Sequence, residues 1–144
     1  MKNFVCMGIL VLMTVFFTVP AYATDGTKNA GAQGIIMPQF TYISVLIPGL
    51  SINSIGTATC AGLASAYNSS HRTILTVELQ KSNAGGWSTI KSWSASSTGA
   101  SLAKIEEDYY VARGTYRVRA TAKVYNASGT LLESQSLYSD TVIY

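Results

Sequence analysis

The chain has 144 residues, and 10 Lys and Arg residues against 7 Asp and Glu residues leave it a net charge of only +3 at pH 7. This charge is too small for a protein that binds nucleic acid or a membrane surface through a dense basic patch. Two cysteines and a single histidine also provide few of the side chains that nucleophilic or metal-assisted catalysis requires.

The N-terminus has the pattern of a secretory signal peptide. Lys2 precedes an apolar run over residues 4–19, and the small residues Ala21 and Ala23 stand just before a cleavage position. The run is shorter than the roughly 20 residues that a membrane-spanning helix needs. The sequence therefore predicts a signal peptide over residues 1–23 and a secreted, extracellular product with no membrane span after cleavage.

The next residues separate this segment from the folded domain. Residues 24–34 are rich in Gly, Ala and Asn and have no periodicity, which is typical of a flexible leader. We expect the domain to span residues 35–144. Cleavage would remove Cys6 and leave Cys60 as the one cysteine, so no disulfide within the chain is expected.

Residues 35–52 are apolar on both alternating faces, with Ile43 and Leu46 expected on opposite sides. Pro38 and Pro48 interrupt the segment. Because proline cannot donate a backbone hydrogen bond, the segment is predicted to be an edge strand that enters the core.

The stretch "GTATCAGLASAY" alternates with a period of two, and its inward residues are unusually small. They are Ala58, Cys60, Gly62, Ala64 and Ala66. A free cysteine in such a row packs as a small hydrophobic residue, so a buried thiol is predicted. A reactive thiol would need a base, and the sole histidine, His71, lies in the polar turn "NSSHR" with no catalytic motif around it.

The following segment reads as a hairpin. Residues 72–81 alternate cleanly, and the turn over residues 82–86 leads into "WSTIKSW". Its Trp87, Ile90 and Trp93 recur every three residues, which cannot place all of them on one face of a regular strand. Either a bulge reconciles them or one of the faces is exposed to solvent.

The second half of the domain continues as strands. "SASSTGAS" is interpreted as a loop, residues 102–111 as a strand, and residues 130–144 as one or two strands with a kink near Ser139 and Asp140. Between them, "GTYRVRATAKVY" has two different faces, and Gly129 suits the left-handed position of a tight hairpin turn. The apolar face comprises Tyr116, Val118, Ala120, Ala122 and Val124.

About seven short strands, at a spacing of about 10 residues and with no amphipathic helix, are the signature of an antiparallel sandwich. The fold class is therefore predicted to be all-β. The segment "VARGTYRVRA" resembles the corner and following strand of fibronectin type III and immunoglobulin-like domains, in which a tyrosine hydroxyl bonds back to the backbone; Tyr116 is the matching residue.

A longer arrangement resembles a family of short, uncharacterised secreted proteins of Gram-positive bacteria. Its motifs are "GTATC", "LQKSNAGGWSTIKSW", "GTYRVR" and "YSDTVIY", within residues 56–144. The resemblance implies a signal peptide followed by an immunoglobulin-like or fibronectin-III-like β-sandwich. It implies no activity.

The polar face of the "GTYRVRATAKVY" strand carries Arg117, Arg119 and Lys123. If this strand lies between the one at residues 72–81 and the C-terminal one, Glu78 and Glu133 are expected to face it. Two interpretations remain open: a solvated face that neutralises its own charge, or a binding face for an anionic wall polymer or glycan. Nucleic acid is disfavoured by the low charge density.

No catalytic, metal or cofactor site is predicted. The chain has no nucleophile motif and no pair of histidines at metal spacing. Glu106, Glu107 and Asp108 could supply oxygen ligands to calcium, but adjacent residues of a strand point to alternating sides.

The sequence thus predicts a secreted, non-enzymatic β-sandwich that binds or assembles at the cell envelope or in the extracellular matrix. One alternative is a carbohydrate-binding module in which Trp87 and Trp93 stack on sugars, although large aromatics in a small sandwich are usually core. Another is self-association through residues 35–47. A third is a secreted antibacterial or toxin-like protein.

Overall fold

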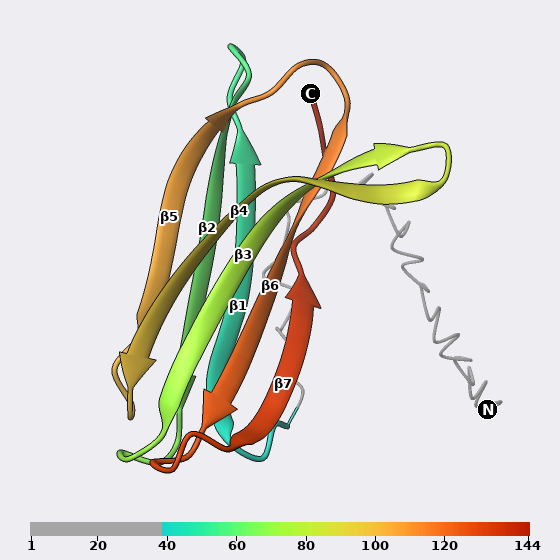
Figure 1. The fold of residues 1–144 in the computed structure, drawn as a ribbon. Helices are drawn as coiled ribbons and strands as arrows, with labels where there is room; N and C mark the ends of the chain where they lie inside the picture. The colour runs from blue at the N-terminus through green and yellow to red at the C-terminus, as the bar shows by residue number, and fades with distance from the viewer. Residues whose placement is uncertain (1–38) are drawn as a thin grey trace, which may run out of the picture. The chain divides into compact units, whose positions relative to one another are not determined.

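A computed structural model describes residues 39–144 of the chain. In this range eight strands form two antiparallel sheets, and there is no helix (Figure 1). The signal peptide predicted for residues 1–23 and the leader predicted for residues 24–34 lie outside this part of the chain. No helix long and apolar enough to cross a membrane is found among the described residues.

The strands are β1 (Ile43–Ile52), β2 (Thr57–Ala66), β3 (Arg72–Asn83), β4 (Gly86–Thr98), β5 (Ala103–Tyr110), β6 (Thr115–Tyr125), β7 (Leu131–Tyr138) and β8 (Val142–Ile143). One sheet has the order β1-β2-β5, and the other has the order β4-β3-β6-β7 with β8 paired to β6. The two sheets pack face to face, which confirms the predicted sandwich (Figure 1). The break between β7 and β8 coincides with the kink expected near Ser139 and Asp140.

The core lies between the sheets and comes from the alternation seen in the sequence. Leu75, Val77 and Leu79 of β3 are completely buried. The apolar row of β6, from Tyr116 to Val124, is likewise buried, with at most 1% of any side chain exposed. Since β3 and β6 are the central strands of the larger sheet, their inward rows form the middle of the core.

The small residues of β2 let the sheets approach closely. Gly62 lies under Val77, and a Cβ atom at Gly62 would overlap the Cγ2 atom of Val77. Cys60 is completely buried two residues earlier on the same face, as predicted. The row of alanines and glycine is therefore a packing surface for the larger side chains of β3.

The corner between β5 and β6 has the predicted tyrosine contact. The hydroxyl of Tyr116 donates a hydrogen bond to the backbone carbonyl of Ala112 at 2.7 Å. The bond closes the turn around Gly114 and fixes the start of β6.

The structure corrects two sequence interpretations. A register shift between Ile43 and Val45 puts both Ile43 and Leu46 in the core rather than on opposite faces, although β1 is an edge strand containing Pro48, as expected. The Ser-rich residues 94–98, expected to be a loop, continue β4 because β3 pairs with them as far as Arg72–Thr98. Cross-strand pairing here overrides local composition.

Candidate functional site

The outward side of the larger sheet collects most of the predicted site residues. We call it the polar face, and its members are Thr76, Glu78, Gln80, Trp87, Thr89, Ser94, Arg117, Arg119, Thr121, Lys123, Ser136 and Tyr138. The register of β3 and β6 pairs Glu78 with Arg119 and Gln80 with Arg117. Because paired residues of neighbouring strands point to the same side, these four side chains are brought together.

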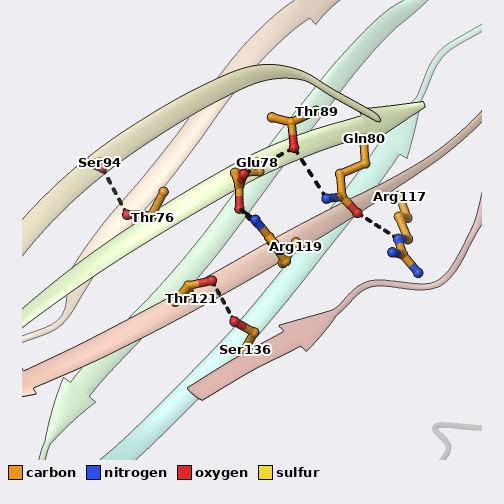
Figure 2. A network of polar contacts seen from close by, with 9 residues as sticks. All are labelled: Thr76, Glu78, Gln80, Thr89, Ser94, Arg117, Arg119, Thr121 and Ser136. Atoms are coloured by element: carbon orange, nitrogen blue, oxygen red, sulfur yellow. Dashed lines mark hydrogen bonds and ion pairs between the residues drawn. The ribbon is translucent and has the colours of Figure 1, made fainter. Parts of the chain in front are cut away.

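Hydrogen bonds between side chains tie the polar face together (Figure 2). Thr76 and Ser94 share a hydrogen bond of 3.1 Å between β3 and β4, and Thr121 and Ser136 share one of 2.7 Å between β6 and β7. The network holds the side chains of four strands in a defined arrangement. A fixed arrangement loses less entropy when a ligand binds.

Arg119 is neutralised within the protein. Its Nε atom donates to the Oε2 atom of Glu78 at 2.6 Å, and its Nη2 atom lies 2.5 Å from the same oxygen. The hydrogen bond that Arg119 donates to Glu78 raises the pKa of Arg119 above its ordinary value, against the opposing effect of burial. Glu78 also accepts a hydrogen bond from Thr89 at 3.1 Å. The ion pair between Arg119 and Glu78 supports the interpretation of a self-neutralised face, but only at Arg119.

Arg117 has different surroundings. Its Cζ atom lies 4.2 Å from the ring centroid of Trp87 and 4.1 Å from that of Tyr138, so the guanidinium is held between two aromatic rings. The Nε atom donates to Oε1 of Gln80 at 2.9 Å (Figure 2). Within residues 39–144, no carboxylate forms an ion pair with Arg117. The cation is immobilised but not neutralised.

Glu133 does not face the cations, and that expectation was wrong. It pairs with the inward residue Val124, so its side chain lies on the opposite side of the sheet. There its carboxylate accepts backbone N–H groups of Thr41, Tyr42 and Ile43 at 3.2, 2.7 and 2.9 Å. Burial alone would raise the pKa of Glu133, but these hydrogen bonds outweigh it and lower the pKa below its ordinary value. As a result Lys123, exposed on β6, has no ion-pair partner in the described part of the chain.

Trp87 and Trp93 lie on opposite faces and form no common platform. A bulge shifts the register between Leu79–Lys91 and Gln80–Thr89 and leaves Ile90 unpaired. Trp93 consequently pairs with the inward Val77 and packs against the core, with the Tyr109 ring at 6.5 Å in an edge-to-face contact. Trp87 turns to the polar face. The spacing allowed a bulge that brings all three residues to one face, and this bulge instead separates the pair of tryptophans proposed for sugar stacking.

The thiol of Cys60 and the acidic run at residues 106–108 have surroundings that do not favour a reactive or metal-binding role. Burial, and secondarily the charge of Asp108, raises the pKa of the Cys60 thiol to about 12, which removes its nucleophilicity at neutral pH. In the acidic run, Glu106 pairs with Lys104 at 2.7 Å and Asp108 accepts a hydrogen bond from Thr59 at 2.7 Å. Residues 39–144 contain no cluster of three or more His, Cys, Asp or Glu side chains suited to a metal ion.

Sequence reasoning missed the residues that hold Arg117. The alternation of residues 72–81 did not link Gln80 to Arg117, and Tyr138 was noted only as the first residue of the motif "YSDTVIY". Period-two alternation along β7 from Ser134 to Tyr138 would have put Tyr138 on the polar face. The distance between Tyr138 and Arg117 could not be predicted from local patterns, because it depends on the register between β6 and β7.

Comparisons with known proteins place the chain in no family. No family model matches it, and no curated protein is significantly similar to it. Among solved structures, it is similar to the solution structure of R. palustris CsgH, at 16% identity and a TM-score of 0.37, over 67% of this chain and 92% of that chain. A likeness this distant has no bearing on function. The resemblance to short secreted Gram-positive proteins therefore stays a prediction.

Proposed function

We propose that the protein is a secreted, non-catalytic β-sandwich that binds an anionic polymer of the cell envelope or matrix through the polar face. The observation that carries the proposal is Arg117, a cation held between Trp87 and Tyr138 without a carboxylate partner among the described residues.

The surroundings of Arg117 suit an oxyanion. Gln80 occupies the Nε atom, and the two Nη nitrogens donate no hydrogen bond to any residue in the described range. A guanidinium with free Nη groups binds carboxylate or phosphate through two parallel hydrogen bonds. Because the rings already restrict the side chain, binding costs less rotamer entropy than it would for a free surface arginine.

The rest of the face suits a polymer rather than a small ion. Hydroxyl groups of Thr76, Ser94, Thr121 and Ser136 extend across the strands, and the Tyr138 side chain is 49% exposed beside the guanidinium. Hydroxyl and aromatic groups bind sugar units, whereas the cations bind acidic substituents. Lys123 adds a second positive charge on the same strand.

The competing interpretation is a solvated face with no ligand. Retention of the full chain on three immobilised polymers distinguishes the two: polygalacturonate as a carboxylate polymer, polyphosphate as a phosphate polymer, and a neutral glucan. Binding to at least one of the anionic polymers is expected, and it should weaken as salt rises because exposed charges are screened.

The matched variants are Arg117→Gln and Lys123→Gln, which each remove one positive charge from the same strand. Arg117→Gln should weaken binding by at least about tenfold, the loss expected for a bidentate charge-assisted contact, and Lys123→Gln by only about twofold. Equal small losses in both variants would indicate unspecific attraction. Absence of binding to both anionic polymers would reject the proposal.

Two earlier alternatives stay predictions. Self-association through residues 35–47 involves a segment of which residues 35–38 lie outside the description, and Ile43 and Leu46 within it are core residues. An antibacterial or toxin-like role has no observation in its favour. The two-tryptophan sugar platform is not proposed, because Trp87 and Trp93 face opposite sides.

A further inference from the structure

The longest strand of the domain is at an edge and is nearly uncharged. β4 has 13 residues and pairs, within residues 39–144, only with β3, so its other edge carries backbone N–H and C=O groups with no partner strand in that range. Beyond the bulge, residues 91–98 pair with β3 in unbroken register. Lys91 is the one charged residue of β4. Such an edge is a template for a further strand.

The other edge strands carry features that oppose strand addition. β5 has charged residues along most of its length, from Lys104 to Asp108. β1 contains Pro48, and Glu133 already binds the backbone N–H groups where β1 begins. β7 has only eight residues, and it is the strand that supplies Glu133. Proline, charge and shortness are common protections of sheet edges.

The open side next to β4 has complementary charges. Between β4 and β5 lies a groove of about 520 Å³ whose walls include Trp93, Ala95, Ile105 and Glu107. Glu107 pairs with the inward Cys60, and Lys91 pairs with the inward Leu79, so both charged groups border the space between the sheets. Both residues are exposed, and neither forms an ion pair with a described residue.

We propose that two copies of the chain associate by antiparallel pairing of β4 with β4, about a twofold axis, so that the Lys91 of each copy faces the Glu107 of the other. A twofold interface uses the same surface on both copies, so one surface must supply both partners of each contact. This side of the domain does so, because the otherwise neutral, Ser-rich β4 carries the cation Lys91 and the strand β5 across the groove carries the anion Glu107. An uncharged strand avoids like charges directly opposite each other.

Pairing of this kind joins the two larger sheets into one. The two polar faces would then lie on a single continuous surface, each with its own Arg117. Two linked sites raise the apparent affinity for a polymer without any new contact. The dimer itself does not depend on polymer binding, and its test needs no ligand.

The test is the mass of the full chain by analytical ultracentrifugation over a concentration series. A monomer–dimer equilibrium is expected. Lys91→Glu should raise the dissociation constant of the dimer at least about tenfold, since it brings like charges together. The double variant Lys91→Glu with Glu107→Lys should restore it. Lys123→Glu, the same change of charge on a strand distant from the edge, should leave it unaltered.

Hydrogen exchange provides an independent readout. The amides of β4 that point away from β3 should become more protected as concentration rises, while those of β5 should not. If Lys91→Glu proves to be misfolded by circular dichroism, Ser96→Lys, at an exposed position of β4, gives the same comparison. A chain that stays monomeric up to about 1 mM, growth beyond a dimer, or a dimer insensitive to these variants would overturn the proposal.

Discussion

Arg117 and Arg119 are two residues apart on β6, yet only the charge of Arg119 is neutralised by an ion pair among the described residues. Arg119 lies opposite Glu78 and forms an ion pair, whereas Arg117 lies opposite the neutral Gln80 and stacks between two rings. An ion pair within the chain competes with any external anion, but a cation–aromatic contact leaves the charge in place. Whether an arginine of β6 is neutralised within the protein or keeps an unpaired charge therefore depends on one residue of the neighbouring strand.

Cys60 shows how burial controls reactivity at the residue scale. Its thiol is completely buried and its pKa is raised to about 12, so it should not react with a bulky thiol reagent at pH 8 over hours. Denaturant should make the reaction complete. Rapid labelling of the folded chain would contradict this. Because the folded pKa is the higher one, the associated stability is complete below about pH 9 and is lost as pH rises towards 12; Cys60→Ala should lack this dependence.

At the scale of elements, β2 and β1 contribute to the sandwich in different ways. β2 packs the sheets together through small residues, whereas β1 is attached at its beginning by a carboxylate from β7. The contact of β2 with the other sheet depends on side-chain volume, and the attachment of β1 to β7 depends on the charge of the carboxylate. Stability should therefore respond to a change of volume on β2 and to a change of charge on β7.

Gly62→Ala should destabilise the fold by about 1–3 kcal/mol, because the added methyl group would overlap Val77 across the core. Gly49→Ala on β1 is the matched control. There the new Cβ atom would meet only the Cβ atom of Ala61 at 3.4 Å, so a change of about 0.5 kcal/mol or less is expected. Urea unfolding measures both. A similar effect in the two variants would mean that sheet separation at Gly62 is larger than described.

Glu133→Gln should cost about 1.5–3 kcal/mol, because three backbone N–H groups lose a charged acceptor. The lowered pKa predicts the pH dependence: the contribution is present above the ordinary value of 4.5 and is lost as pH falls through the lower folded value. The variant should therefore show a flatter acid limb in unfolding measured below pH 4.5. Glu106→Gln, an exposed carboxyl on β5, serves as control and should change stability by less than about 0.5 kcal/mol.

At the scale of the whole molecule, the larger sheet has one face towards the core and one face outward, and each face carries a tryptophan of β4. Trp93 packs against the core and Trp87 lies on the polar face, although both belong to β4 and are only six positions apart. Folding and binding should consequently be affected by different tryptophans.

Trp93→Ala should lower the free energy of unfolding by about 2–4 kcal/mol, because it removes a large side chain from the core boundary. Trp87→Ala should cost less than about 1 kcal/mol, the value of a partly exposed cation–aromatic contact. The second variant should instead weaken retention on the anionic polymer. Denaturant unfolding and the retention assay together check the pair, and the reverse assignment of effects would contradict the described register.

Local alternation was sufficient to predict the all-β class, the inward rows of β3 and β6, the buried Cys60 and the outward placement of Arg117, Arg119 and Lys123. A period of two places side chains on faces whatever the rest of the chain does. Tyr116 and its corner were predicted from a short resemblance, and the hydroxyl contact with Ala112 confirms it.

Where alternation is interrupted, the sequence was not sufficient. The bulge at Ile90 and the register shift after Ile43 reverse the faces of Trp87, Leu46 and their neighbours. The pairing of Glu133 with Val124 removed it from the cations. Each of these depends on which residue of one strand lies opposite which residue of another, and a shift by one residue exchanges the faces.

Apart from the Ser-rich end of β4, the sequence by itself thus determined the type of the elements and the side on which a regular strand displays its charges, because both follow from spacing within a few residues. Only the tertiary structure decided that Arg117 lies between Trp87 and Tyr138 while Arg119 is paired with Glu78, and that β4 is the edge open to a further strand. Those arrangements join residues from separate strands, and the register and order of the strands come from packing of the whole sandwich.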